Sequence, residues 1–330
     1  MPTPPTLAIR SSTAISDDAI KVVAINCVQL RSLDVSHSRI TDEGIKVLAA
    51  NCLQLCSLNV SNSNGKITDS SIKVVGMNCR QLELLNVSST DGAITDESIK
   101  VVAANCSRLQ SLNVVHTLGS ITDECIKLVV AHCPQLECLD AHVTEGKITD
   151  ESIKVVGAKC LRLRSLNVSF TKGMITDASM NVVGSSCLRL TRLLVQDTGG
   201  KITDESIKIV GAKCRLLESL DVSETCGAIT DESIKIVAVN CANLQYLDVS
   251  DTEGKITDDS IKLVALNCSL LRTLDAKKSK GGITDDSIKL VAAHCPFLES
   301  IHVTDTMGRV TQATLSLLPA NSLVFGERCL

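Results

Sequence analysis

The chain has 330 residues, and its 33 Lys and Arg against 37 Asp and Glu give a formal net charge of −4 at pH 7. It has no basic block or arm, so we expect no nucleic-acid partner. No secretion signal opens the chain and no apolar run reaches the roughly 20 residues of a membrane span, so we expect no membrane association and a cytoplasmic location, with a nuclear one as the alternative. With no Trp, one Tyr and three Phe, the core must be aliphatic, which favours a repeat protein.

The first segment, residues 1–14, is predicted to cap the N-terminal end of an array. A stack of repeats exposes an apolar edge at each end, and such edges need covering. We expect a strand between Thr6 and Thr13 to do this.

Residues 15–309 are predicted to form eleven units. The phrase Ile-Thr-Asp recurs with a period of 27, its isoleucine standing at Ile40, Ile67, Ile94, Ile121, Ile148, Ile175, Ile202, Ile229, Ile256 and Ile283. Ile15 opens a first unit of 25 residues. No linker interrupts the series, so the sequence predicts one continuous domain.

The unit from Ile94 to Ser120 shows the elements expected in each repeat. Thr95 is a plausible helix N-cap, and apolar residues then follow at helical spacing up to Cys106. The pattern L-x-x-L-x-V from Leu109 onward predicts a short strand, and Gly119 marks the loop to the next helix.

A strand and a helix every 27 residues with this leucine spacing indicate leucine-rich repeats. Parallel strands stack about 4.8 Å apart whereas helices need about 8 to 10 Å, so the stack must bend with its strands inside. We therefore predict an α/β solenoid, a right-handed horseshoe with a parallel concave β-sheet and helices on the convex face.

One column of cysteines also recurs in step with the repeat, at Cys27, Cys52, Cys79, Cys106, Cys133, Cys160, Cys187, Cys214, Cys241, Cys268 and Cys295. One thiol per unit on an apolar helix face behaves as a small hydrophobic residue and suits a reducing compartment. The Ile-Thr-Asp phrase and this cysteine, followed by x-x-L-x-x-L, resemble the cysteine-containing leucine-rich repeats of F-box substrate receptors and mitotic-exit antagonist proteins. The resemblance covers about residues 15 to 321. It implies ubiquitin-ligase components as partners.

The chain departs from this family in the column after each strand, where the family often has Cys or Asn. Here the column is hydroxylic: Ser38, Ser63, Thr90, Thr117, Thr144, Thr171, Thr198, Thr225, Thr252, Ser279 and Thr306. We expect these hydroxyls to satisfy buried backbone groups at the turn, so that Thr171→Val costs about 1 to 3 kcal/mol.

Two polar patterns have structural interpretations that we favour over a site. The Asp and Lys of each helix, such as Asp96 and Lys100, are predicted to pair at i, i+4 on a solvated convex surface. A polar row at the middle of the strands faces the concave side, and its carboxylates could in principle hold a metal or supply a general acid. Its members are Asp34, Asn59, Asn86, Asn113, Asp140, Asn167, Leu194, Asp221, Asp248, Asp275 and His302. We expect it to be a feature of the repeat that turns acidic in the later units.

Departures from the repeat are the best candidates for a partner-binding site, because Arg and aromatic side chains among small residues are typical interface anchors. They are Val115, His116, Cys138, His142, Val143, Phe170, Arg192, Leu194, Gln196 and Tyr246. The competing interpretation is drift on an unused surface. Three of them, His116, His142 and Cys138, lack any recognised zinc-ligand or catalytic spacing. We expect no catalytic residue, no metal and no cofactor.

The function predicted from this pattern is a non-catalytic scaffold, a monomer that binds a partner protein on its concave face and adjacent loops. One alternative is a substrate-recognition subunit of a ubiquitin ligase without its own F-box, since only fourteen residues precede Ile15. A small-molecule receptor is a second alternative, although Ser-lined strands argue against a deep pocket. Recent duplication without a selected binding function is also open.

The last segment, residues 310–330, is predicted to be a degenerate unit and C-terminal cap. We expect a helix from Gln312 to Leu318 that ends at Pro319, and a closing strand from Ser322 to Phe325. Cys329, near the end, is the thiol expected to react first.

Overall fold

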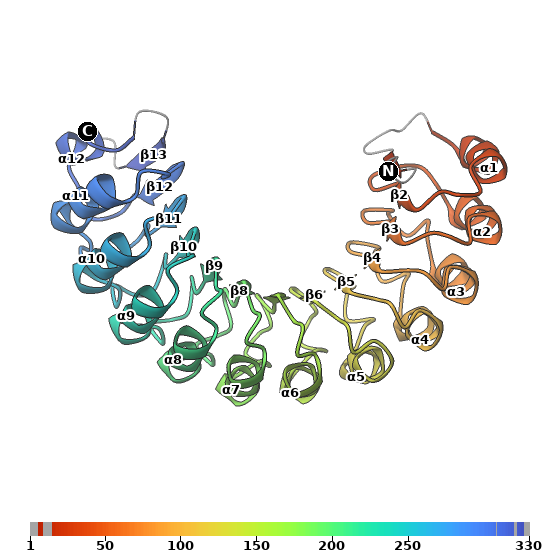
Figure 1. Ribbon diagram of the computed structural model, residues 1–330, viewed down its shortest axis with the longest axis horizontal. Helices are drawn as coiled ribbons and strands as arrows, with labels where there is room; N and C mark the ends of the chain where they lie inside the picture. The colour runs from red at the N-terminus through yellow and green to blue at the C-terminus, as the bar shows by residue number, and fades with distance from the viewer. Residues whose placement is uncertain (1–5, 9–14, 308, 320–321, 327–330) are drawn as a thin grey trace. The chain divides into compact units, whose positions relative to one another are not determined.

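The computed structural model describes residues 6–8, 15–307, 309–319 and 322–326, and it divides into two compact units, Met1–Leu163 and Arg164–Leu330. In each unit short strands lie along the inner, concave side and helices along the outer side (Figure 1). This is the predicted leucine-rich-repeat architecture, in which one strand and one helix form each repeat.

The first unit alternates strands and helices in chain order. Its elements are β1 (Thr6–Ala8), α1 (Asp17–Asn26), β2 (Ser32–Asp34), α2 (Asp42–Asn51), β3 (Ser57–Asn59), α3 (Asp69–Asn78), β4 (Leu84–Asn86), α4 (Asp96–Asn105), β5 (Ser111–Asn113), α5 (Asp123–His132), β6 (Cys138–Asp140) and α6 (Asp150–Lys159). Strands β1 to β6 pair in parallel in that order.

The second unit repeats the plan and ends with a shortened helix followed by a last strand. Its elements are β7 (Ser165–Asn167), α7 (Asp177–Ser186), β8 (Arg192–Leu194), α8 (Asp204–Lys213), β9 (Ser219–Asp221), α9 (Asp231–Asn240), β10 (Tyr246–Asp248), α10 (Asp258–Asn267), β11 (Thr273–Asp275), α11 (Asp285–His294), β12 (Ser300–Val303), α12 (Gln312–Leu315) and β13 (Leu323–Gly326). Strands β7 to β13 also pair in parallel in chain order.

Strand register converts each sequence column into a row of side chains. Leu85 pairs with Leu112 and Asn86 with Asn113, so residues 27 apart stand side by side. Because successive side chains in a strand point to opposite faces, Leu85 and Leu112 are buried against the helices while the asparagines face the concave side. The core is therefore one leucine-lined layer between sheet and helices.

The threonine of Ile-Thr-Asp has two roles. The hydroxyl oxygen of Thr95 accepts a hydrogen bond from the backbone N–H of Glu97, as the predicted N-cap should. Thr95 also donates its backbone N–H and its hydroxyl to the Asp69 carboxylate of the preceding repeat, at 2.8 and 2.6 Å. We call this inter-repeat pair the Asp–Thr clasp.

The clasp corrects the role expected for the helix aspartates. Asp96 accepts from Thr122 of the next repeat, so the predicted surface pair with Lys100 is not its main interaction. Several lysines reach forward instead, as Lys73 does to Glu97 at 3.7 Å. The sequence analysis placed these residues correctly at the first helical turn but missed that they join adjacent repeats.

The column cysteines follow the helices rather than lie within them, and they are more than small apolar groups. Buried Cys106 caps α4, and its thiol donates to the carbonyl oxygens of Cys79 and Gly76 in the preceding repeat, at 3.5 and 3.7 Å. Burial, with the neighbouring Cys133 thiol, raises the pKa of Cys106 to about 12. The cysteines of the described residues form no disulfide with one another.

The hydroxyl column divides into two groups. Thr117 and Thr225 donate their hydroxyls to the carbonyl oxygen three residues earlier, each at 3.1 Å, which is the predicted role. The buried hydroxyl of Thr171, by contrast, has no hydrogen-bond partner among the described residues, and Thr144 and Thr198 share this state. The structure therefore contradicts the hydrogen bond on which the expected cost of Thr171→Val was based, because no such bond would be lost there.

At the ends, β1 forms the first strand of its sheet, and residues 9–14 of the predicted cap strand lie outside the described residues. Helix α12 is shorter than expected, and the closing strand β13 begins and ends one residue later than expected. Cys329 lies outside the described residues. None of the helices that the structure describes combines the length and the apolarity that crossing a membrane would require.

Candidate functional site

The concave polar row lies at the last residue of strands β2 to β11 rather than at the middle, and at the third residue of β12, His302. In the first unit the side-chain oxygens of Asn59, Asn86 and Asn113 each accept the backbone N–H two residues later, at 3.0, 3.0 and 3.1 Å. An N–H donor must meet the amide oxygen and not its nitrogen, so the Nδ2 groups are the ends left facing the concave side. The structural interpretation of this row is supported, but it leaves a line of exposed donors.

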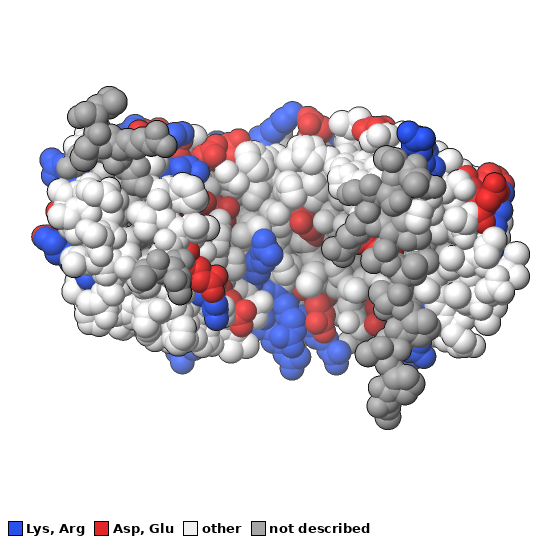
Figure 2. Space-filling view, turned by 90° about the horizontal axis from the view of Figure 1, so that it is seen from above, with Lys and Arg blue, Asp and Glu red and all other residues white. Residues whose placement is uncertain are grey.

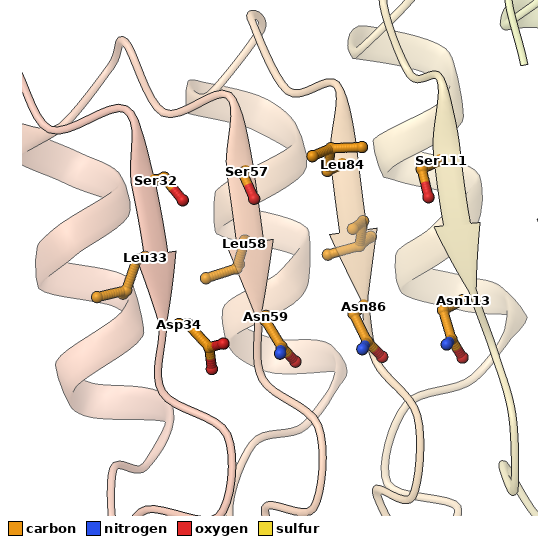
Figure 3. A pocket seen from close by; sticks show the side chains of 11 residues that line it. Ser32, Leu33, Asp34, Ser57, Leu58, Asn59, Leu84, Asn86, Ser111 and Asn113 are labelled. Atoms are coloured by element: carbon orange, nitrogen blue, oxygen red, sulfur yellow. The ribbon is translucent and has the colours of Figure 1, made fainter. Parts of the chain in front are cut away.

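These asparagines line a shallow groove of about 330 Å³ on strands β2 to β5 (Figure 3). A second row along the groove, at the first residue of each strand, is Ser32, Ser57, Leu84 and Ser111. Leu84 is 44% exposed where its neighbours are serines, which makes it an apolar contact point in a polar surface. We call this surface the amide groove. Its Asp34 and asparagines belong to the polar row named from the sequence, whereas Leu84 was not named there, although it departs from the serine row.

The predicted partner-binding residues of the first unit gather on β5, β6 and the loops after them. The rings of His116 and His142 meet edge to face with centroids 6.1 Å apart, and His142 Nδ1 lies 2.7 Å from an Asp140 carboxylate oxygen. Cys138 is half-buried on β6, whereas Val115 is only 5% exposed and offers little contact area.

Val143 is an unusual residue type for its backbone conformation. Its φ of 53° lies in the left-handed region, where other repeats place residues such as Asn62, Ser89 and Asp251. A β-branched residue there is strained, whereas Asn and Asp tolerate the conformation. The conformation belongs to the loop and recurs in each repeat, so the departure lies in the residue type.

The remaining predicted residues lie in the second unit. Arg192 and Leu194 are the first and last residues of β8, with Arg192 exposed, and half-buried Phe170 follows β7. Gln196 donates its side-chain amide to Glu224 at 2.9 Å. Tyr246 opens β10, two strands away from β8, so it does not join this group.

The second unit also carries an acidic row, the part of the polar row that was expected from the sequence to be a feature of the repeat. Asp221, Asp248 and Asp275 pair in register on β9 to β11 and are only 8%, 8% and 6% exposed. Burial and the neighbouring Asp221 carboxylate raise the pKa of Asp248 to about 6. The hydroxyl of Tyr246 donates to Asp248 at 3.5 Å, and His302 Nδ1 lies 2.8 Å from Asp275. We call these three carboxyls the aspartate row.

Charged groups around the aspartate row partly compensate one another. Lys277 Nζ lies 3.4 Å from an Asp275 oxygen, and Lys278 pairs with Asp251 at 2.7 Å. The ring of His302 packs edge to face on Phe325 with centroids 4.2 Å apart. Within the part of the chain that the structure describes, no three His, Cys, Asp or Glu side chains are placed to hold a metal ion. On the visible face, acidic and basic side chains are scattered among uncharged ones (Figure 2).

Comparisons with known proteins agree with this geometry. A family model described as leucine-rich repeat matches residues 26–49. A search of curated proteins returned no match. Among solved structures, the fold is similar to a chain in the crystal structure of the yeast Rad7 and Elc1 complex, with a TM-score of 0.69 and 18% identity over 95% of this chain and 84% of that one. It is also similar to an internalin, InlF, from Listeria monocytogenes, with a TM-score of 0.61 and 19% identity over 98% and 87% of the two chains.

The fold is therefore that of the leucine-rich-repeat proteins, and the repeats of this chain are of a cysteine-containing kind. At these identities the solved structures support the fold alone. What the concave surfaces bind has to be argued from their own residues.

Proposed function

We propose that the protein is a non-catalytic interaction scaffold that binds a partner protein on its concave sheet faces and the loops after the strands. The observation that carries the proposal is where the repeats differ. Helices keep nearly the same surface from repeat to repeat, whereas His116, His142, Phe170 and Arg192 alter the strands and the loops that follow them. Solenoids offer such curved surfaces to extended partners.

The chemistry of these surfaces supports binding rather than catalysis. The concave carboxylates and amides are held by backbone N–H groups two residues on, which gives them a structural role in fixing the loops. Serine and asparagine side chains supply most of the polar lining of the amide groove, whereas small-molecule pockets are lined predominantly by apolar and aromatic side chains. We also propose a cytoplasmic location. The described cysteines form no disulfide with one another, which suits a reducing compartment.

The kind of partner is the finer part of the proposal. One similar structure was solved as a complex with a second protein, Elc1, and this supports a protein partner. The resemblance to F-box repeat proteins adds ubiquitin-ligase components as candidates, with the chain as a substrate-recognition subunit.

Affinity purification from the native cells tests the proposal, with bound proteins identified by mass spectrometry. The chain is compared with a His116→Ala/His142→Ala variant, a Phe170→Ala/Arg192→Ala variant and a convex-face control, Lys208→Ala. A specific partner retained by wild type and control but lost by either concave variant supports the scaffold. Partners held equally by all four proteins would overturn the concave assignment, and co-purified ligase subunits would select the ligase role.

A further inference from the structure

The loop that follows strand β3 contains an asparagine directly before a glycine. Asn64 and Gly65 form the single Asn-Gly pair of the sequence. An asparagine in this setting is prone to lose its side-chain amide. The reason is that the following glycine has no Cβ to hinder its backbone nitrogen when that nitrogen approaches the asparagine side-chain carbonyl carbon. In a folded chain the reaction also requires that the loop is accessible to water and free to turn.

The pair lies in a tight turn on the surface. Asn64 is exposed, and its φ of 49° and the φ of 67° at Gly65 both lie in the left-handed region. A hydrogen bond from the backbone N–H of Lys66 to the carbonyl oxygen of Ser63, at 3.1 Å, closes the turn. The backbone N–H of Gly65 itself donates to no backbone acceptor among the described residues. The nitrogen that has to attack is therefore not held by a backbone partner.

The turn at Gly65 is also more open than a corresponding turn further along the first unit. A Cβ placed on Gly65 would meet nothing within 4 Å. At Gly119 the same atom would lie 3.1 Å from the Lys147 side chain of the following repeat. The attack requires rotation about the Cα–C bond of Asn64 and opening of the hydrogen bond that closes the turn. At Gly65 no side chain of the next repeat obstructs that rotation.

We propose that Asn64 is a site of spontaneous deamidation in the folded chain, where isoaspartate and aspartate form with time. The backbone nitrogen of Gly65 gives its proton to a base in the solvent and bonds to the side-chain carbonyl carbon of Asn64. The bond from that carbon to the amide nitrogen breaks, and this nitrogen takes up a proton from water and leaves as ammonia. A cyclic imide remains.

Water then opens the imide at either of its carbonyl carbons. Attack at the backbone carbonyl carbon breaks its bond to the Gly65 nitrogen and yields isoaspartate, whereas attack at the side-chain carbonyl carbon yields aspartate. The balance is one amide and one water converted to one carboxyl group and one ammonia, with no oxidant or further co-reactant. The inference is independent of the proposed function, because it concerns a reaction of the chain with water alone.

The two products differ in their effect on the fold. Aspartate fits the turn, because Asp91 stands at the same position of the next repeat with a φ of 54°. Isoaspartate instead adds a methylene group to the backbone inside the turn. The chain directly after the turn is anchored, since Ile67 is fully buried and Thr68 bonds to Asp42 of the preceding repeat at 2.8 and 2.7 Å. Isoaspartate should therefore loosen this joint, and aspartate should only add a negative charge.

The same loop supplies an internal control. Asn62 also has a left-handed φ, 56°, but Ser63 follows it, and the Cβ of Ser63 hinders the approach of the backbone nitrogen. The blocking variant is Asn64→Gln, because a glutamine has to close a larger ring and reacts far more slowly. Glu145 and Lys172 occupy this position in other repeats with φ values of 54° and 55°, so we expect the variant to fold, and a melting curve checks this. Asn64→Asp supplies the aspartate product as a reference.

The full chain is incubated at physiological temperature at neutral and at mildly alkaline pH, digested at intervals and mapped by mass spectrometry, with fragment spectra to assign each site. Isoaspartate is measured by transfer of a labelled methyl group from S-adenosylmethionine with isoaspartyl methyltransferase. We expect Asn64 to convert about tenfold or more faster than Asn62, and faster at the higher pH, because the attacking nitrogen has to lose its proton. Asn64→Gln should lose the methyl label. The Thr68 amide should exchange with deuterium faster in the isoaspartate fraction than in Asn64→Asp, and equal exchange would refute the loosened joint.

Equal conversion of Asn62 and Asn64 would overturn the inference, as would a methyl label that persists in Asn64→Gln. A sample unfolded in urea provides the remaining comparison. If Asn64 reacts in urea but keeps its amide in the folded chain over the same period, the folded turn prevents the attack and the inference fails. Conversion at Asn64 in the folded chain, together with loss of the label in Asn64→Gln, would support it.

Discussion

Asp248→Asn should make the protein more stable at neutral pH and not at acidic pH. In the folded chain the carboxyl of Asp248 is buried beside the carboxylate of Asp221, and its pKa is raised to about 6 from an ordinary 3.8. A raised pKa means that the folded state holds the proton more tightly than the unfolded chain does. The stability that protonation adds is fully present below about pH 4 and is lost as the pH rises through about 6.

The magnitude follows from those two pKa values. Between pH 7.5 and pH 4.5 the wild-type chain should gain about 2 kcal/mol from this carboxyl, since one pKa unit corresponds to about 1.4 kcal/mol. An asparagine does not titrate, and it keeps the oxygen that accepts from the Ser250 backbone N–H. The difference in unfolding free energy between variant and wild type should therefore shrink by about 2 kcal/mol over this pH range.

Urea unfolding followed by circular dichroism at pH 7.5, 6.0 and 4.5 measures this difference. A carbon-detected titration of the aspartate carboxyls gives the pKa independently of whether unfolding is two-state, which long repeat arrays do not always obey. A stability difference that stays constant within about 0.5 kcal/mol from pH 7.5 to 4.5 would refute the reasoning, as would a carboxyl that titrates near 4.

Four other substitutions test the hydroxyl column within the repeats and the contacts between adjacent repeats, each read from a melting curve or a denaturant midpoint. Thr225→Val removes a hydroxyl that bonds a carbonyl at 3.1 Å and should cost about 1 to 3 kcal/mol, whereas Thr171→Val, which loses no such bond, should be nearly neutral; equal costs would contradict the division of this column. Gly211→Ala should destabilise by about 1 to 3 kcal/mol despite a better helix propensity, because the added Cβ would lie 2.9 Å from backbone nitrogen of the next helix; a rise in melting temperature would show that the helices can separate freely. Asp204→Ala removes the carboxylate that accepts two hydrogen bonds from Thr230, at 2.9 and 2.6 Å, and should cost about 2 kcal/mol. An unchanged unfolding free energy would show that the Asp–Thr clasp does not stabilise the fold.

Much of the fold was predictable because each repeat carries the same local sequence signals. The cap at Thr95, the turn at Gly119 and the buried leucines follow from residue type and spacing, and the structure confirms them. The partners of Asp96 were not predictable in this way. Its carboxylate meets a residue 26 positions later, and only the stacking of repeats shows that Thr122 lies within reach.

The surfaces were less predictable, because exposure and protonation depend on neighbours. His116 and His142 were chosen for being unusual, and the structure does bring their rings together. The pKa of Asp248 is raised because neighbouring carboxyls lie at strand spacing and because the side chain is buried from solvent. The sequence shows the row of aspartates but not their burial. The donor character of Asn86 is similar, since it depends on which end of the amide the backbone engages.

The Asp–Thr clasp has a consequence for how such a chain can change length. Thr203 bonds to Asp177, and Thr230 bonds in the same way to Asp204, exactly one repeat further along the chain. Excising residues 204–230 would place Asp231 directly after Thr203, where Asp204 now stands, and Asp231 already receives Thr257. Every donor would then find an equivalent acceptor. Whole repeats can thus be lost or gained without leaving an unmatched joint, so the length of the array is free to vary while its register stays fixed.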